Sequence, residues 1–492
     1  MKSNFCNSFV DKYLRTEKSQ RFLISFAPFI VLLCLALGML AYLFGIPGFG
    51  YRFSANTPLG ILIRFISISV LVLYCLLCVV SLKIRISYNL VIIYSFLLGF
   101  NFLMALISPH TYTTMFLSQY FRVGMYYYAS TNMATLLISY LSSVADFVWG
   151  FCFLLVLPEL FRNKKSIMIV FASYVVFMLA CCLYSLIKEK DYYILLMTHP
   201  EKIGSAIGAH SVFDSKQSYG VLLCPAFCCS LLSSKLALMQ SNKKSSSILL
   251  CFAFAIASLL LFFFTAASLC RTAIVGNLIM LIIFYISIGV SALKKKRIVL
   301  GSLLFFVFVI LIIFFILFLT QESLHSSGIL NKLYIFIKTK IVDRIESSSD
   351  SRLIIAVSFL REIPTINLFF GLSKGLLDLY VRSLSPILRY GLHSGFIIYL
   401  GNYGVISLFI TYLLTIKIVF TNFKNIKIDP MLVISIFGCF VTAFLFNISE
   451  AEILVFSSST LVFMFNFILL VFSNSKYVRD YYLIGGRYEN EM

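Results

Sequence analysis

The chain has 492 residues, of which 60% are hydrophobic and 12% are charged, and its mean hydropathy is +0.97. This composition excludes a soluble globular domain, which cannot bury so much apolar surface, and indicates a polytopic membrane protein. The formal net charge is +20, but the basic residues are spread over many short segments, which argues against nucleic-acid binding and for contact with anionic membrane lipids.

Apolar windows long enough to cross a bilayer recur along the whole chain. A helical span needs about 20 apolar residues, and backbone groups in lipid must be satisfied internally, which favours helices over strands. The sequence therefore predicts an all-α polytopic membrane protein with about twelve transmembrane helices. The windows are 22–44, 59–81, 88–108, 132–157, 167–186, 218–240, 248–269, 272–292, 298–320, 394–416, 431–449 and 453–473.

The charge of the connecting segments predicts the orientation. Lys and Arg are enriched in both tails and in alternate short loops, such as 162–165 and 294–297, and such segments are typically cytoplasmic. We therefore expect both termini inside and one large periplasmic loop that contains short helices. The predicted organisation is a cytoplasmic tail (1–21), transmembrane helices 1–9 (22–320), the large periplasmic loop (321–393), transmembrane helices 10–12 (394–473) and a second cytoplasmic tail (474–492).

The cysteines and motifs do not indicate a bound group. None of the 13 cysteines falls in 321–393, so no disulfide framework is predicted. Cys75 and Cys78 form a CxxC pair within an apolar span without a second pair, which indicates packing residues. No Asp-x-Asp pair lies in an outer loop and no Walker-type glycine loop is present, so we expect neither a metal nor a cofactor.

Three ionisable residues fall within predicted spans, namely Arg64, Asp146 and Lys235. Arg64 lies near the start of its span, where it either snorkels to the surface or faces the protein interior. Asp146 lies in the middle of the fourth span. A carboxylate at that depth is either a functional group or a packing residue satisfied by a partner, and both interpretations remain open.

Two polar turns place a cation at the start of a span: 208–220 brings Lys216 to the sixth span, and 266–276 brings Arg271 to the eighth. A cation at a helix N-terminus opposes the helix dipole. Such a placement favours a bound anion, because a helix start with a cation is a receptor for phosphate. The alternative for both residues is an interfacial charge that reaches the membrane surface.

The large loop 321–393 carries nine Lys or Arg residues and six acids. Positive charge is normally depleted in outer loops, so an anionic substrate would explain the excess. Contact with lipid headgroups is the alternative.

Three segments together resemble the O-antigen polymerase and O-antigen ligase superfamily, whose members are integral-membrane glycosyltransferases of the type-C kind. The resemblance covers most of the chain and is most specific over 351–409. It rests on Phe213-Asp-Ser-Lys-Gln-Ser-Tyr-Gly220, on Ser268-Leu-Cys-Arg271-Thr-Ala, and on a loop with Ser351-Arg352, Gly371-Leu-Ser-Lys-Gly375 and Leu392-His393-Ser394 before Leu400-Gly-Asn-Tyr-Gly404.

The resemblance implies an enzyme of the bacterial inner membrane that transfers an undecaprenyl-pyrophosphate-linked saccharide at the periplasmic face, without metal or nucleotide sugar. Its expected partners are that lipid-linked oligosaccharide, membrane lipids and a chain-length regulator. Three family positions map onto Arg271, Arg352 and His393. His393 then serves as the general base for the acceptor hydroxyl or only as a hydrogen-bonding group, with Glu450 as an alternative base.

Further candidates follow from charge and position. Gln217 and Ser394 stand where the family often has asparagine, and Arg361 with Gly371 matches a polymerase pattern loosely. The candidate pyrophosphate-binding residues are Arg271, Arg352, Arg389 and Lys216, and the candidate sugar or loop contacts are Gln217, Arg361 and Ser394.

The long chain with its large loops favours a polymerase that joins lipid-linked repeat units. A ligase that moves the finished glycan to lipid A core has the same charge requirements and is the alternative. A lipid-linked oligosaccharide flippase is a second alternative from another class, although we would expect it to bury more ionisable residues than the three within these spans.

Overall fold

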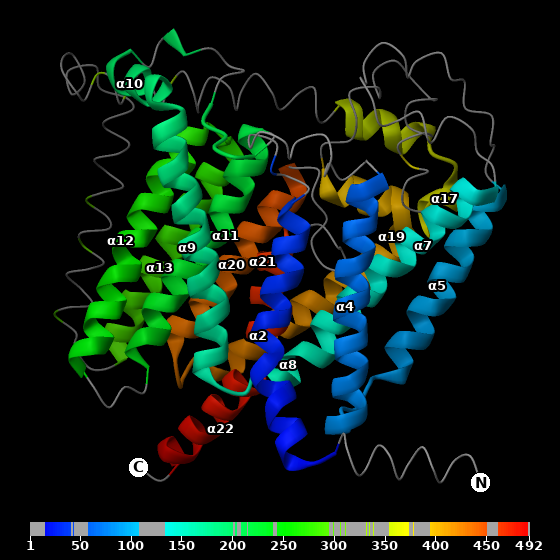
Figure 1. Ribbon diagram of the computed structural model, residues 1–492, viewed down its shortest axis with the longest axis horizontal. Coiled ribbons are helices and arrows are strands. Elements are labelled where there is room, and N and C mark those ends of the chain that lie inside the picture. Colours follow the sequence, from blue (N-terminus) through cyan, green and yellow to red (C-terminus); the bar gives the residue numbers. More distant parts are fainter. Residues whose placement is uncertain are drawn as a thin grey trace.

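The computed structural model shows a bundle of helices (Figure 1). It describes residues 15–40, 43, 58–107, 133–199, 202–203, 208–213, 215–239, 244–294, 299, 306, 310, 331, 334, 338, 354–372, 377, 394–449 and 461–490. Within these residues every regular element is helical, and nine helices are long and apolar enough to cross a membrane. The protein is therefore an all-α polytopic membrane protein.

The long helices are α2 (Glu17–Met39), α4 (Pro58–Leu82), α5 (Tyr88–Ile107), α7 (Met133–Phe151), α9 (Lys164–Lys188), α11 (Lys216–Leu238), α12 (Lys244–Ser268), α13 (Arg271–Lys294), α19 (Gly395–Thr421) and α20 (Pro430–Ser449). The remaining elements are α8 (Leu157–Leu160), α10 (Lys190–Thr198), α17 (Thr365–Phe370), α21 (Phe463–Asn466), α22 (Lys476–Asn490), π-helical turns at Cys152–Val156 and Phe467–Phe472, and a 3₁₀ turn at Asn422–Asn425.

These helices overlie ten of the predicted windows. The window 298–320 lies almost wholly outside the described residues, and only the second half of 453–473 is described. Helix bounds differ from the windows by a few residues. For example, α2 begins at Glu17 because Thr16 caps it by accepting from Ser19 N. Hydropathy locates the apolar stretch, whereas the cap decides where the helix begins.

Helix α11 is the centre of one half of the bundle. Of its most apolar stretch, 89% is buried, compared with 33% for its neighbour α12. It packs on α9, α12, α13 and α20, and Figure 1 shows these helices around it on the left of the molecule. The mean hydropathy of this stretch is 1.8, below the 2.7 of α12, and α11 buries Ser230, Ser233 and Ser234. Polar and small residues favour contact with other helices over contact with lipid, which agrees with the central place of α11.

The other half contains α5, α7, α17 and α19, and its main feature is a break in α19 at Gly404. This glycine has φ 83°, and a Cβ there would overlap Phe369 O, so only glycine fits. The Asn101 side chain donates to Phe370 O and to Asn402 O, each at 2.7 Å. It thereby satisfies carbonyls beside the break, as backbone away from water requires.

The two ends of the bundle are distinct. At one end, the α22 end, Lys235 pairs with Asp429 at 2.8 Å and Tyr481 of α22 donates to the same carboxylate at 3.0 Å. Gln20 near the start of α2 donates to Ser81 O at 2.9 Å at this end. At the other, the α10 end, α11 and α13 begin (Figure 1). The first described helix thus starts at the end where the C-terminal helix lies.

Candidate functional site

Lys216 is the first residue of α11, and a serine cap fixes this helix start. Ser215 Oγ accepts from Ser218 N at 3.1 Å, which is a common way for serine to begin a helix. Lys216 is half-buried and the following Gln217 is exposed. Because a lysine at this place opposes the helix dipole, the cap rather than the charge accounts for where α11 begins.

Arg271 opens α13 after a tight turn from α12. Within the turn, Ser268 Oγ donates to Thr265 O at 2.7 Å and accepts from Cys270 N at 3.2 Å. Leu269 has φ 56°, a left-handed backbone that typically costs a non-glycine residue about 1 kcal/mol or more. The half-buried Arg271 therefore stands at a helix start whose backbone is held by local hydrogen bonds.

Gly208 lies between the start of α11 and the turn that precedes α13. A Cβ on this residue would lie 2.5 Å from Ser268 O and 2.8 Å from Lys216 Cδ. The Lys216 side chain and the α12–α13 turn therefore approach the same point, which only glycine leaves free. Lys216 and Arg271, called here the cationic pair, belong to one small region of the α10 end.

The start of α19 and the last turn of α20 reach this end too. Thr442 Oγ1 donates to Gly276 O at 3.2 Å, and Cys439 Sγ lies 3.9 Å from Met280 Sδ. This antiparallel register places Arg271 level with the last turn of α20. There, Ser394 Oγ donates to Asn447 O at 3.5 Å, so α13, α19 and α20 converge.

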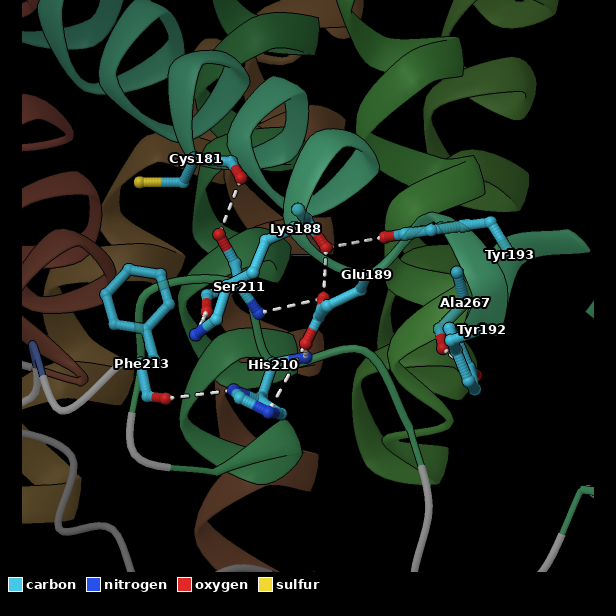
Figure 2. A network of polar contacts seen from close by, with 10 residues as sticks. Cys181, Lys188, Glu189, Tyr192, Tyr193, His210, Ser211, Phe213 and Ala267 are labelled. Carbon is cyan, nitrogen blue, oxygen red and sulfur yellow. Dashed lines mark hydrogen bonds and ion pairs between the residues drawn. The ribbon is translucent and has the colours of Figure 1, made fainter. Parts of the chain in front are cut away.

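A largely buried carboxylate organises the loop before α11 (Figure 2). Glu189, between α9 and α10, accepts from Ser185 Oγ at 2.5 Å and from Ser211 N at 3.2 Å through Oε2. Its Oε1 accepts from His210 N at 3.2 Å and pairs with His210 Nε2 at 3.3 Å. Lys188 Nζ donates to Ser211 O at 3.2 Å. One side chain thus holds two consecutive backbone amides of the loop.

Two tyrosines of α10 extend this network. Tyr193 OH lies 2.8 Å from Ser185 Oγ, and Tyr192 OH donates to Ala267 O at 2.5 Å. Burial, to which the Glu189 charge adds, raises the pKa of both tyrosines far above the usual range, so both hydroxyls stay neutral. Ala209 N also donates to Ala267 O, at 3.3 Å. The α12–α13 turn is therefore linked to the same loop.

The structure brings four of the predicted site residues to the same end, namely Lys216, Gln217, Arg271 and Ser394. Of these, Gln217 is exposed. Arg361 is exposed on the helix 354–362, which packs through Phe359 on α19 at Gly401. The predicted residues outside the described part of the chain are His393, Glu450, Arg352 and Arg389.

Sequence reasoning assigned no role to Glu189 or to its partner His210. Glu189 stands in the mixed-charge run Lys188-Glu-Lys-Asp191, a pattern typical of a solvated surface. Only the return of the chain at 210–211 gives the carboxylate its partners. The run of polar residues before α11 was the available signal, but it did not identify a partner.

The three ionisable residues within the predicted spans have different surroundings. Asp146 is fully buried and accepts from Tyr403 OH at 2.8 Å. Lys235 lies at the end of α11, where it pairs with Asp429 at 2.8 Å. Arg64 is half-buried. Asp146 and Lys235 thus each have a polar partner on another segment of the bundle.

The chain matches no protein-family model, and comparison with curated proteins and with solved structures gives no significant match.

Proposed function

We propose that this protein is a polymerase of the O-antigen type, an inner-membrane glycosyltransferase that joins undecaprenyl-pyrophosphate-linked repeat units at the periplasmic face. The observation that carries the proposal is that Lys216 and Arg271 each open a helix and that these two helix starts are adjacent. The sequence segments that resemble the superfamily, 213–220 and 268–273, are the ones that meet there.

The arrangement suits a pyrophosphate leaving group. As the bond between the anomeric carbon and the phosphate oxygen breaks, negative charge develops on that oxygen. The guanidinium of Arg271 and the ammonium of Lys216 offset this charge, and the amides of the first turns of α11 and α13 add partial positive charge. Because the Gly208 contact and the Ser215 and Ser268 hydrogen bonds fix both helix starts, little reorganisation is needed during reaction.

The acceptor hydroxyl must also lose a proton. His393 is the proposed base and Glu450 the alternative. Both lie outside the described residues. In the sequence, His393 precedes Ser394 and Glu450 follows the last residue of α20. Ser394 Oγ contacts Asn447 O in the last turn of α20, and Arg271 lies beside that turn. Both observations support a base near the leaving group. His393 has the ordinary chemistry of a neutral-pH proton acceptor.

The distribution of charge supports the proposed orientation. Short connections at the α22 end carry many cations and the positive-inside rule assigns such connections to the cytoplasm. The α10 end would then face the periplasm. These cations are Lys83, Arg85, Arg162, Lys165, Lys424 and Lys427.

A deletion strain tests the function directly through gel analysis of its lipopolysaccharide. Loss of a polymerase should leave lipid A core carrying a single repeat unit, because the ligase elsewhere still works. A core without any O-antigen, with lipid-linked polymer accumulating, would instead identify the ligase. Single lipid-linked units trapped on the cytoplasmic side would identify a flippase. An unchanged ladder of chain lengths would refute all three assignments.

A further inference from the structure

We propose that Glu189 is the positioning residue of the cationic pair, and that its hold on the loop 208–213 is strengthened by a protonated His210. The consequence for transfer rests on the proposed function, whereas the hold itself is a property of the described contacts. Neither Glu189 nor His210 takes part in the transfer chemistry proposed for this end of the bundle.

Glu189 is well placed to fix this loop. Its side chain is 11% exposed, and its two oxygens together accept from Ser185 Oγ, from the consecutive amides of His210 and Ser211, and from the His210 ring. Ser211 has φ 58°, an unfavourable backbone for a serine, which persists only where its surroundings impose it. The bond from Ser211 Oγ to Cys181 O at 2.6 Å anchors the same residue from the other side.

The loop transmits this hold to the cationic pair. At its beginning, Gly208 touches the Ser268 carbonyl and the Lys216 side chain, and Ala209 N donates to Ala267 O. At its end, the chain continues within a few residues into the Ser215 cap of α11. A loop released from Glu189 would therefore disturb the spacing between the starts of α11 and α13.

The His210 ring is bonded in a way that only one protonation state satisfies. Its Nε2 faces Glu189 Oε1 at 3.3 Å, and its Nδ1 faces Phe213 O at 3.2 Å. Both partners are acceptors. A neutral imidazole has one N–H and can satisfy one of them, whereas the imidazolium satisfies both. The ring is 42% exposed, so protons from water can reach it.

Other ionisable groups lie around the loop. Tyr192 and Tyr193 of α10 remain neutral, because burial raises the pKa of each. The charged groups around the loop include cations of several elements, namely Lys188 of α9, Lys216 of α11 and Arg271 of α13. In the sequence, the acids Asp191 and Asp214 lie within two residues of Glu189 and of Phe213. A neutral His210 ring keeps only one of its two hydrogen bonds and no longer gives the Glu189 carboxylate a cationic partner. We therefore expect the loop to be looser when the ring is neutral.

Hydrogen exchange of the peptide covering 208–213 tests the hold, with the full-length protein in lipid nanodiscs. After correction for intrinsic rates, protection should fall about tenfold between about pH 6 and about pH 9, because alkaline solution favours the neutral ring with its single N–H. His210→Gln should give weaker, pH-independent protection. In Glu189→Gln, protection should be low at both pH values, because an amide has one acceptor oxygen and cannot serve both sets of donors.

Glu159→Gln provides a matched control, since Glu159 pairs with Arg479 at the α22 end. It should retain the wild-type pH dependence at 208–213. Equal protection at both pH values in wild type, with no change in His210→Gln, would overturn the proposal. If Glu189→Gln does not fold, the comparison of wild type with His210→Gln still decides.

The same variants separate this inference from the proposed function. In vesicles supplied with undecaprenyl-pyrophosphate-linked repeat units, wild-type transfer should fall as pH rises, and His210→Gln should remove that part of the dependence. Transfer that is absent at every pH, together with the expected exchange pattern, would refute the polymerase but support the hold. If transfer is active but wild type and His210→Gln show the same exchange and the same pH profile of transfer, the hold is refuted and the proposed function is not.

Discussion

Two carboxylates in this chain lie in contrasting regions. Glu189 sits in a connection at the α10 end and accepts hydrogen bonds from backbone amides, a hydroxyl and an imidazole that is 42% exposed. Asp146 lies within α7, is fully buried, and accepts from Tyr403 of α19. Tyr403 immediately precedes the break at Gly404. One carboxylate holds a loop near water, and the other ties two spans together inside the protein.

The surroundings of the two carboxylates differ in packing and in polarity. Around Asp146 the surrounding side chains are aromatic and close-packed: Phe147 lies 5.0 Å from Tyr403, and Tyr399 lies 4.9 Å from Tyr403, between ring centroids. Such an interior is suited to fixing helices. Around Glu189 the polar groups lead to the cationic pair and to the surface. We therefore expect changes at the α10 end to alter transfer, and changes around Asp146 to alter stability.

Arg271→Ala should give the largest effect. Loss of a preorganised charge at the leaving group is expected to lower the transfer rate by about 10²–10³-fold, with little change in thermal stability. Arg271→Lys should restore part of the rate, because a lysine keeps the charge but lacks the bidentate fork. Arg85→Ala, an exposed change at the α22 end, is the matched control. Wild-type transfer by Arg271→Ala would remove this residue from the site.

Gly404→Ala tests the other region and should mainly reduce stability. Its φ of 83° and the overlap of a Cβ with Phe369 O predict a loss of about 2–3 kcal/mol in the free energy of unfolding. Gly99→Ala in α5 is the control, because a Cβ there meets nothing within 4 Å. Thermal unfolding in detergent measures both. Equal stability of the two variants would show that the break is not required.

Asp146 variants should give the smallest effect and the sharpest comparison. Asp146→Leu leaves the Tyr403 hydroxyl without this acceptor and should cost about 1–3 kcal/mol of unfolding free energy. Asp146→Asn retains a carbonyl acceptor for Tyr403 and should cost less, with transfer close to wild type. If Asp146→Asn is stable yet abolishes transfer, the contrast between the two regions fails, because the ionised form of Asp146 would then be part of the function.

Part of the candidate site was predictable from local sequence. The placement of Lys216 and Arg271 at helix starts follows from the polar turns that interrupt apolar windows, and both residues are found at the starts of α11 and α13. The closeness of the two helix starts was not predictable from the sequence. It depends on Gly208 reaching the Ser268 carbonyl, a contact between segments 60 residues apart in the chain.

The sequence by itself determined the class of fold, because long apolar stretches in lipid must form helices to satisfy their own backbone. Only the tertiary structure decided which polar groups meet. Tyr403 reaches Asp146 across 257 residues of chain, and Glu189 acquires donors only when residues 210 and 211 return beside α9. Hydropathy is a property of short segments, whereas the satisfaction of a buried carboxylate depends on the packing of segments distant in sequence.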